Sequence, residues 1–355
     1  MISPYSLSVP GGVQGQILGL ARAIRARGES VRVLAPCDGP PPEPFVTPLG
    51  NSVPTGANGS IVPLAPDPAA QLRTIRALRD EEFDVLHLHE PLAPGPTMTA
   101  LLMRPSPIVG TFHRAGSSVA YDIFKPLTSR GAKRIDIRFA VSDDAEELAV
   151  HALGGHYERA FNAVEVSRYR TSTPYETDGP TIFFIARHEE RKGLAVLLEA
   201  FGGLEPSTRL WVAGVGPETA ELQSRFAGDP RISWLGEIDE QEKMGRMLGA
   251  DVFCAPSLHG ESFGIVLLEA MAADTAVVAS DIPGYASVTR QGRDGVLFPA
   301  GDPIALTSEL RGILGDRERR DALVLSGSER VTGFSMRRLA DLYLNAYERA
   351  IEMYS

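Results

Sequence analysis

Two glutamates, Glu261 and Glu269, flank an almost wholly apolar run and could bind the two ends of one extended ligand. The run predicts a buried helix over residues 263–273, whose polar ends should meet a ligand or a cap. The first turn of such a helix offers free backbone N–H groups and the positive end of the helix dipole, which suit a diphosphate. Eight residues of helix span about 12 Å, roughly the reach from a sugar ring across a diphosphate to a ribose. The alternative is an ordinary solvated helix that carries two glutamates.

Two cations, Arg187 and Lys192, follow a predicted strand and precede a predicted helix. At such a turn they could neutralise a departing nucleoside diphosphate. Gly214 and Gly216 end the next predicted strand, where a missing side chain lets the backbone approach a ligand. Taken singly, the two cations are more typical of surface charges. Together with the glutamates, they predict a nucleotide-binding site.

The first half of the chain carries a second set of candidates. Gly11 and Gly12 precede a predicted helix and could lend N–H groups to the same phosphates. His113 follows a predicted strand, at the carboxyl edge where open α/β sheets bind ligands. A lone histidine at a strand end is more often structural, and that alternative stays open.

Three neighbouring residues, His87, His89 and Glu90, look like metal ligands. Strand alternation places both histidines on one face, but no further ligand follows at a spacing typical of zinc sites. We therefore expect no metal site here.

Short apolar runs alternate with longer helical stretches along the chain. The predicted strands cover residues 31–35, 84–89, 108–112, 135–141, 181–185, 209–213, 231–235, 251–255, 276–280 and 296–298. The predicted helices cover residues 13–27, 69–81, 143–153, 194–201, 218–226, 241–248 and 263–273. Runs that are apolar on both faces and separated by helices indicate parallel sheets covered on both sides. The predicted fold class is therefore α/β.

The length of 355 residues, at about 150 per domain, predicts two domains. A polar segment with two prolines, residues 166–180, predicts a linker between a first domain (1–165) and a second (181–334). Ten prolines between Pro36 and Pro68 predict an irregular surface excursion.

The start of the chain departs from the pattern of a doubly wound domain, which opens with a strand, a glycine turn and a helix. Here only Ile2 and Ser3 precede Pro4 and the glycine turn. The central strand is therefore expected to be short or missing. A start further upstream and a native short strand are equal alternatives.

The composition is that of a soluble globular protein, with 43% hydrophobic and 23% charged residues, which excludes disorder. A net charge of −10 argues against a nucleic-acid partner, so any phosphate ligand needs a local cationic pocket. The two cysteines, Cys37 and Cys254, form no disulfide framework, and no signal-peptide pattern opens the chain. We expect a cytoplasmic protein.

Several motifs together resemble glycosyltransferase family 4, the retaining enzymes of the GT-B fold. They are Pro10-Gly11-Gly12-Val13, Thr111-Phe112-His113, Val141-Ser142, Arg187…Lys192-Gly193 and Glu261-Ser262-Phe263-Gly264…Glu269-Ala270. Within the family, the chain is most similar to the phosphatidyl-myo-inositol mannosyltransferases, through Pro4-Tyr5-Ser6, His87-Leu88-His89-Glu90-Pro91 and Gly260-Glu261-Ser262-Phe263-Gly264-Ile265-Val266. The resemblance implies two doubly wound, Rossmann-like domains that face a central cleft. It also implies that the final helix, within residues 335–355, returns to the first domain.

The resemblance assigns roles to these residues. Glu261 would hold hydroxyls of the donor hexose and Glu269 those of the ribose, while Arg187 and Lys192 would bind the diphosphate. The catalytic set would be His113, Arg187, Lys192 and Glu261. The other donor-binding residues would be Gly12, Gly214, Ile238 near the base, Ser262, Phe263, Gly264 and Ile265. The acceptor side would be lined by Tyr5, Gly11, Gly12, Asn58 and His113.

Three positions depart from the family's pattern. Ala163 stands where the family has a glycine, which bears on donor or hinge geometry. Pro63 replaces the basic residue expected near the acceptor's phosphate, which bears on a phosphoinositide acceptor. The shortened opening strand bears on stability.

The resemblance implies transfer of a hexose with retention, mannose from GDP-mannose being the favoured donor and phosphatidylinositol or a related lipid the favoured acceptor. No carboxylate in these motifs is placed as a nucleophile, unlike in retaining glycosidases. In the family's front-face reaction the departing diphosphate, stabilised by Arg187, Lys192 and helix N-termini, helps to deprotonate the acceptor. No metal is then required, and magnesium is expected at most to stimulate.

Two alternatives stay open. One is a family member that uses another nucleotide sugar and a soluble small-molecule acceptor. The other is a catalytically weakened protein that binds nucleotide sugars as a sensor, a possibility raised by Ala163 and the short start. A two-domain solute-binding protein is disfavoured by the missing signal peptide and by the cluster of Glu, Arg and Lys residues.

The helix predicted over residues 69–81 suits a membrane surface. Basic and apolar residues recur at every third position in two adjacent stripes, Arg73, Arg76, Arg79 and Leu72, Ile75, Leu78. Such a helix can lie on an anionic bilayer, where each arginine contributes about 1 kcal/mol. The alternative is a domain helix whose apolar stripe packs on the sheet. We expect peripheral contact with the inner face of the cell membrane.

Overall fold

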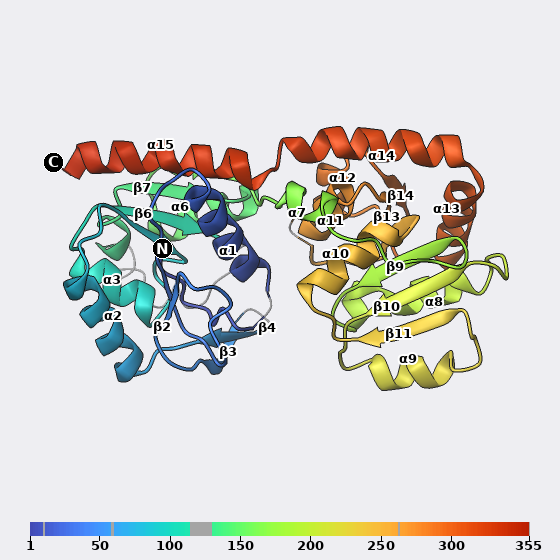
Figure 1. The fold of residues 1–355 in the computed structure, drawn as a ribbon, viewed down its shortest axis with the longest axis horizontal. Coiled ribbons are helices and arrows are strands. Elements are labelled where there is room, and N and C mark those ends of the chain that lie inside the picture. Colours follow the sequence, from blue (N-terminus) through green and yellow to red (C-terminus); the bar gives the residue numbers. More distant parts are fainter. Residues whose placement is uncertain (10, 58–59, 114–129, 262, 355) are drawn as a thin grey trace. The chain divides into compact units, whose positions relative to one another are not determined.

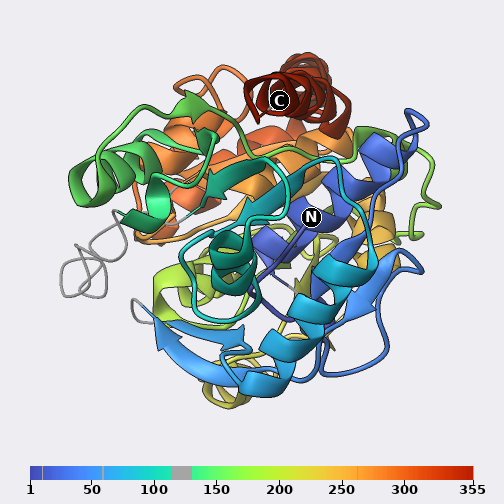
Figure 2. The same cartoon turned by 90° about the vertical axis from the view of Figure 1, so that its left-hand side faces the viewer.

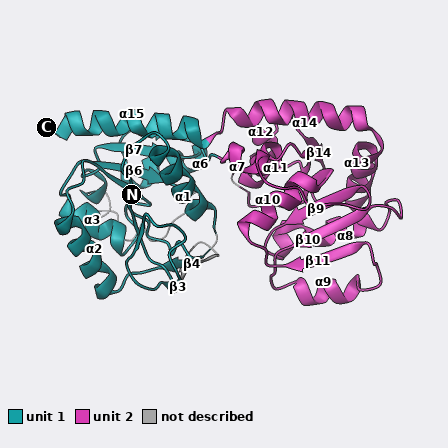
Figure 3. Ribbon diagram, in the orientation of Figure 1, with its two compact units in different colours: residues 1–163, 336–355 teal, residues 164–335 magenta. Residues whose placement is uncertain are grey.

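The computed structural model describes residues 1–9, 11–57, 60–113, 130–261 and 263–354 (Figure 1). The chain divides into two compact units (Figure 3). Unit 1 comprises Met1–Ala163 together with Met336–Ser355, and unit 2 comprises Val164–Ser335. The C-terminal helix α15 (Met336–Tyr354) therefore belongs to unit 1.

Unit 1 is built on a parallel sheet with helices packed against it. Its strands are β1 (Val33–Ala35), β2 (Val46–Pro48), β3 (Val53–Ala57), β4 (Ser60–Leu64), β5 (Leu86–His89), β6 (Ile108–Phe112), β7 (Ile137–Ala140) and β8 (Glu158–Arg159). Besides α15, the helices in the described part of this unit are α1 (Gly12–Arg25), α2 (Pro68–Asp80), α3 (Pro96–Met103) and α6 (Asp143–Leu153). Figure 2 looks along α15, which packs beside α1 through Leu20, Ile24 and Tyr343.

The central strand of unit 1 is reduced to a single residue. Ile2 forms parallel bridges to Leu34 of β1 on one side and to Leu88 of β5 on the other. Its amide donates to the carbonyl of His87 (2.8 Å), and its carbonyl accepts from the amide of His89 (3.0 Å). The expected short strand is thus present and joins β2–β1 to β5–β6–β7–β8.

The proline-rich stretch between Pro36 and Pro68 is not wholly irregular, contrary to the prediction. It contains β2, which pairs with β1 in parallel, and an antiparallel hairpin of β3 and β4. Proline lacks a backbone donor, yet it is tolerated at strand ends and on edge strands. The lone pair of strands in this hairpin has no neighbour among the described strands of the larger sheet.

Unit 2 is a doubly wound parallel sheet of six strands in the order β11-β10-β9-β12-β13-β14. The strands are β9 (Thr181–Ile185), β10 (Arg209–Ala213), β11 (Ile232–Gly236), β12 (Val252–Ala255), β13 (Ala276–Ser280) and β14 (Val296–Phe298). The helices are α7 (Val166–Arg170), α8 (Leu194–Phe201), α9 (Thr219–Arg225), α10 (Glu240–Gly249), α11 (Ile265–Ala272), α12 (Pro283–Val288), α13 (Pro303–Gly315) and α14 (Arg317–Thr332), with a 3-10 turn at Glu190–Lys192. All ten predicted strands are present, so the α/β prediction is confirmed.

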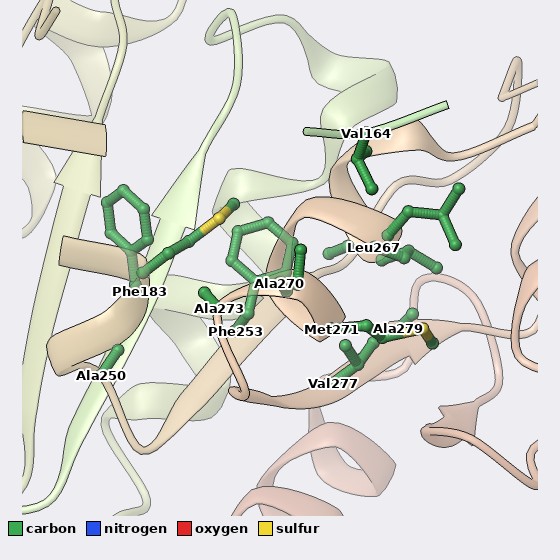
Figure 4. Close-up of a cluster of buried hydrophobic side chains, with 14 of the residues drawn as sticks. Val164, Phe183, Ala250, Phe253, Leu267, Ala270, Met271, Ala273, Val277 and Ala279 are labelled. Carbon is green, nitrogen blue, oxygen red and sulfur yellow. The ribbon is translucent and has the colours of Figure 1, made fainter. Parts of the chain in front are cut away.

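One core layer of unit 2 lies between the sheet and helix α11. Phe183 and Phe253 from neighbouring strands pack against Leu267 and Met271 of the helix (Figure 4). The strands are buried on both faces because a second apolar cluster, which includes Phe184 and other residues, covers the opposite side.

The segment predicted as a linker, residues 166–180, is part of unit 2. It begins with α7, and Tyr169 from this helix is 4% exposed in the core beside α11. The polar residues of the segment concealed this one apolar anchor. Helices α3, α12, α13 and α14 were not predicted either, since they lack clear amphipathic patterns or are short.

Candidate active site

A cluster of polar side chains in unit 2 surrounds Glu261. Its Oε1 atom accepts from Lys192 Nζ, lies 3.3 Å from Arg191 Nη1, and lies 3.4 Å from Ser257 Oγ. Lys192 ends the short turn after β9, and Glu261 lies in the loop after β12. Because β9 and β12 are adjacent parallel strands, their carboxyl ends bring the two loops together.

Arg187, the first predicted cation, lies at the edge of this cluster. Its side chain is 59% exposed, and its Nε lies 3.0 Å from Glu189 Oε1. The other oxygen of Glu189 lies 3.0 Å from Arg191 Nε. The carboxylate of Glu189 thus links Arg187 to Arg191, and Arg191 in turn contacts the carboxylate of Glu261. The sequence analysis missed Arg191, although its place beside Lys192 was a usable signal.

Gly193 lets the loop after β9 turn sharply beside β12. Its φ is +68°, in the left-handed region, and a Cβ atom there would lie 2.0 Å from the carbonyl oxygen of Pro256. Only glycine allows this approach, which holds Lys192 beside the loop that carries Glu261. Gly214 lies similarly at the end of β10 and is partly buried.

Helix α11 begins later than predicted, at Ile265, because Gly264 adopts φ +84° and breaks the helical backbone before it. Phe263 and Glu261 therefore lie in the loop, and the helical distance estimated for the two glutamates does not apply. The N–H groups of the first turn, at Ile265, follow this loop directly. Phe263 packs against Phe334 with ring centroids 5.7 Å apart.

The second glutamate, Glu269, lies on α11 and pairs with Lys243 of α10 at 2.9 Å. Lys243 also lies 3.0 Å from Glu240. Burial acts to lower the pKa of Lys243, but Glu269 and Glu240 outweigh it and raise this pKa. Ile238, predicted to lie near the base, is partly buried against the apolar core between the sheet and α11. Lys243 was missed by the sequence analysis.

A buried hydroxyl pair lies behind Glu261. Ser257 Oγ and Tyr285 OH are 3.0 Å apart, and Tyr285 is 2% exposed. Burial and the nearby Glu261 carboxylate raise the pKa of Tyr285, so its hydroxyl stays protonated. No sequence pattern identified this pair, because Tyr285 reaches the site from α12.

In unit 1, His113 follows β6 and is fixed at two points. Its backbone N–H donates to Glu90 Oε1 (2.7 Å), and its Nε2 lies 3.0 Å from His89 Nδ1. Loss of hydration lowers the pKa of His113 from 6.5 to about 4. The ring is therefore neutral at physiological pH.

His87 connects the sheet to the C-terminal helix. Its Nδ1 lies 2.7 Å from Tyr347 OH, its Nε2 lies 2.8 Å from Thr111 Oγ1, and Thr111 bonds to Tyr343 OH (2.8 Å). His87 and His89 therefore serve as hydrogen-bonding groups of the core. Across the described part of the chain, no three His, Cys, Asp or Glu side chains converge in a way that could hold a metal ion.

Two of the remaining predicted residues, Gly11 and Gly12, lie at the start of α1. Gly12 is the first residue of this helix, and Gly11 precedes it with an extended backbone (φ −178°). Tyr5 forms an antiparallel bridge with Leu64 at the end of β4. Two further predicted residues, Asn58 and Ser262, lie outside the described residues.

Ala163, which departs from the family's pattern, is well accommodated. It is 1% exposed, and both its amide and its carbonyl bond to the side-chain amide of Gln16 at 2.8 Å. Its φ is not positive, so an alanine methyl group causes no backbone strain. The substitution is therefore compatible with an intact fold.

The buried face of α2 differs from the predicted apolar stripe. Ala70, Thr74 and Leu78 point into unit 1, at the i, i+4 spacing of one helix face. Of the three apolar residues in the predicted stripe, only Leu78 is buried. Leu72 is 66% exposed, and Ile75 is partly buried.

The three arginines of α2 are exposed. Arg73 donates to the carbonyl of Leu49 (2.9 Å), and Arg76 pairs with Asp80 of the same helix at 3.2 Å. Exposed ion pairs of this kind contribute little to stability. The described helices include none that is long and apolar enough to cross a bilayer.

Comparison with known proteins identifies the family. A family model described as Glycosyltransferase Family 4 matches residues 10–168, and one described as Glycosyl transferases group 1 matches residues 166–330. A phosphatidyl-myo-inositol mannosyltransferase from Mycobacterium leprae is 41% identical to this chain, covering 98% of it and 96% of that protein. The chain is a family 4 glycosyltransferase. A second relative of the same name, from Mycolicibacterium smegmatis, is 39% identical over 98% of the chain and 92% of that protein.

Solved structures show that this glycosyltransferase has the GT-B fold. A sucrose-phosphate synthase from Thermosynechococcus elongatus superposes with a TM-score of 0.73, at 18% identity and 99% coverage of both chains. Anabaena HepE, in complex with UDP and glucose, gives a TM-score of 0.71 at 16% identity and 98% coverage of both chains. The predicted family, fold class and enzyme class of this glycosyltransferase are confirmed.

Proposed function

We propose that this glycosyltransferase transfers mannose from GDP-mannose to phosphatidylinositol or a related lipid, with retention of the anomeric configuration. The observation that carries the proposal is the cluster of Lys192, Arg191 and Glu261 at the carboxyl ends of β9 and β12. The identity of 38–41% to several phosphatidyl-myo-inositol mannosyltransferases favours mannose as the transferred sugar and phosphatidylinositol as the acceptor.

Unit 2 supplies groups suited to a nucleoside diphosphate. Lys192 and Arg191 present cations to the loop that leads into α11, and the N-terminus of this helix offers backbone N–H groups and a dipole that attract anions. These groups would stabilise the negative charge that grows on the leaving diphosphate, and they need no reorganisation during the reaction. Arg187 is the most exposed of the three cations and would join them when the diphosphate binds.

The two glutamates would divide the remaining parts of the donor. Glu261 would accept hydrogen bonds from hexose hydroxyls, and Glu269 from the ribose hydroxyls. Both carboxylates already pair with lysines, so their oxygens are oriented before the donor binds. Oriented acceptors reduce the entropy that binding would otherwise cost.

Unit 1 would supply the acceptor side. Tyr5, Gly11, Gly12 and His113 would contact the acceptor, and His113 would also assist at the transferred sugar. Pro63 stands where a basic residue would be expected to contact the phosphate of a phosphoinositide. The acceptors to be tested therefore include free myo-inositol. Peripheral contact of α2 with an anionic membrane, at the inner face of the cell, would bring the enzyme to a lipid acceptor.

The test combines purified enzyme, GDP-mannose and vesicles that contain phosphatidylinositol. Formation of a mannolipid with release of GDP, and an α-linked product by NMR, is the expected result. UDP-glucose, ADP-glucose and free myo-inositol serve as the comparison substrates.

Each other outcome has a definite meaning. Transfer from another donor or to free myo-inositol would replace mannose or the lipid in the proposal and keep the glycosyltransferase. Tight donor binding without transfer or hydrolysis would overturn the proposal in favour of a nucleotide-sugar sensor.

A further inference from the structure

One histidine of the buried core holds another that the proposed function places at the substrate. His89 Nδ1 lies 3.0 Å from His113 Nε2, and the two rings stack with centroids 5.3 Å apart and planes 25° apart. His89 is 1% exposed. It ends β5, and its strand neighbour in the β5–β6 register is Thr111, two residues before His113.

The contact requires one ring to donate and the other to accept, because both histidines are neutral. Burial lowers the pKa of His89 well below its usual value, and loss of hydration lowers that of His113 to about 4. One proton therefore lies between the two nitrogens. The ring that carries this proton determines the tautomers of both histidines.

The second nitrogen of His89 decides between the two arrangements. His89 Nε2 is buried and has no hydrogen-bond partner among the residues that the structure describes. If His89 accepted from His113, its own proton would be on Nε2 as a buried, unpaired N–H, a rare and costly arrangement. If His89 donates from Nδ1, Nε2 is only an unpaired acceptor, which is better tolerated.

We propose that His89 is a positioning residue that donates from Nδ1 to His113 Nε2 and so fixes His113 as the Nδ1–H tautomer. His113 then offers its substrate a hydrogen-bond donor at Nδ1, and its Nε2 is not free to act as a base. Glu90 reinforces the arrangement by accepting the backbone N–H of His113 at 2.7 Å. The inference rests on the proposed function only in assigning His113 to the substrate side.

The surroundings of the pair support a neutral, fixed arrangement. His87 lies against His89 with ring centroids 4.2 Å apart, and its own nitrogens are engaged by Tyr347 and Thr111. Among the described residues, the titratable groups near the pair are the neutral His87, which the tyrosines of α15 contact, the Glu90 carboxylate and the N-terminal amine of Met1. A charge on either ring would be poorly solvated here.

Two substitutions separate the hydrogen bond from the presence of a ring. In asparagine, the side-chain nitrogen is two bonds from Cβ, as Nδ1 is in histidine, so His89→Asn keeps a donor at nearly the same place. His89→Leu keeps bulk and removes the donor. His87→Leu is the matched control, since it removes an equally buried histidine of the same strand that does not bond to His113.

The first readout is the tautomer of His113, from ¹⁵N–¹H correlation spectra of histidine-labelled enzyme without any substrate. We expect the proton on Nδ1 in the unchanged protein, in His89→Asn and in His87→Leu, and a shift toward Nε2 in His89→Leu. A proton on Nε2 of His113 in the unchanged protein would overturn the proposal. This measurement does not depend on the reaction that the enzyme catalyses.

The second readout is kinetic, at a temperature well below the melting temperature of every variant. We expect kcat to fall about 10- to 100-fold in His89→Leu, as for other partners that orient a functional group, with little change in KM for the donor. His89→Asn should recover most of kcat. A wild-type kcat in His89→Leu would overturn the positioning role, whereas absence of turnover in the unchanged enzyme would overturn the proposed function and leave the tautomer result standing.

Discussion

Lys192 and Glu261 form a direct ion pair although they lie 69 positions apart in sequence. Their side chains are 19% and 15% exposed, and Ser257 and Arg191 contact the same carboxylate oxygen. Glu261 keeps a cation beside it when Lys192 is removed, because Arg191 Nη1 lies 3.3 Å from the same oxygen. The residues proposed to bind the diphosphate and the hexose also determine each other's position.

Replacing Lys192 or Arg187 by alanine should lower turnover far more than stability. Each cation would act on the charge that develops at the leaving diphosphate, and loss of one such donor costs about 10²–10³ in rate. Steady-state release of GDP and thermal unfolding measure the two effects. Arg225→Ala, which removes an exposed arginine paired with Glu199 in the same unit, is the control and should change neither. Wild-type turnover in both variants would contradict the assignment.

The two glutamates should differ in which part of the donor they bind. Glu269→Ala should weaken binding of GDP and GDP-mannose alike, because both ligands carry the ribose. Glu261→Ala should weaken GDP-mannose more than GDP, because it would contact the hexose. Calorimetry with both ligands on both variants measures the difference. Equal losses for the two ligands in Glu261→Ala would be inconsistent with a hexose contact.

The direct pairing of Glu261 with Lys192 adds a control to this experiment. Glu261→Gln keeps an acceptor for the hexose hydroxyls but weakens the ion pair. If the sugar contact dominates, Glu261→Gln should bind GDP-mannose better than Glu261→Ala does. Similar affinities would indicate that the carboxylate acts mainly by holding Lys192.

Gly193→Ala should destabilise unit 2 and disturb the site together. The left-handed backbone at this position costs about 1–3 kcal/mol for a residue with a side chain. The added methyl group also meets the carbonyl of Pro256. Urea unfolding measures the loss. Gly315→Ala is the matched control, since it has open space around it at the end of α13 and should be neutral or stabilising by about 0.4–1 kcal/mol.

Folding stability should fall as the pH drops below about 6.5. The pKa of His113 is lowered to about 4 in the folded protein, so the unfolded chain binds a proton between these two values while the folded chain does not. The unfolded state then binds more protons, and stability decreases until the folded pKa is reached. His87 and His89 have lowered pKa values for the same reason, burial, and add to the slope.

Urea midpoints between pH 7 and pH 5 test this dependence before most carboxylates titrate. His113→Asn should reduce the slope of this dependence, because it removes one of the groups whose folded pKa is lowered. A midpoint that stays constant from pH 7 to pH 5 would show that these histidines are not neutral in the folded state.

Membrane contact through α2 should depend on its arginines. Replacing Arg73, Arg76 and Arg79 with glutamine should reduce sedimentation with anionic vesicles at low salt, since each arginine near the surface contributes about 1 kcal/mol. The control variant carries glutamine in place of three exposed arginines of unit 2, Arg225, Arg311 and Arg317, and so loses the same charge. Its sedimentation with the vesicles should change little. If the unchanged protein ignores anionic vesicles, a soluble acceptor becomes the better proposal.

Much of the fold was available from the sequence. Strands such as Thr181–Ile185 are short, apolar on both faces and flanked by glycine or polar residues, a pattern typical of a covered parallel sheet. Lys192 and His113 were selected because each follows a predicted strand, and Glu261 because it and Glu269 flank an apolar run. These inferences depend on local pattern and on topology alone.

The tertiary structure decided what local patterns do not encode. Tyr169 turns a polar segment into part of the core, Ile2 replaces a whole strand by bridging two neighbours, and Tyr285 reaches Ser257 from a separate helix. The partners of His89 and Glu261 likewise come from distant segments. Such contacts depend on the packing of several elements at once, and no periodicity within a single element records which side chains will meet.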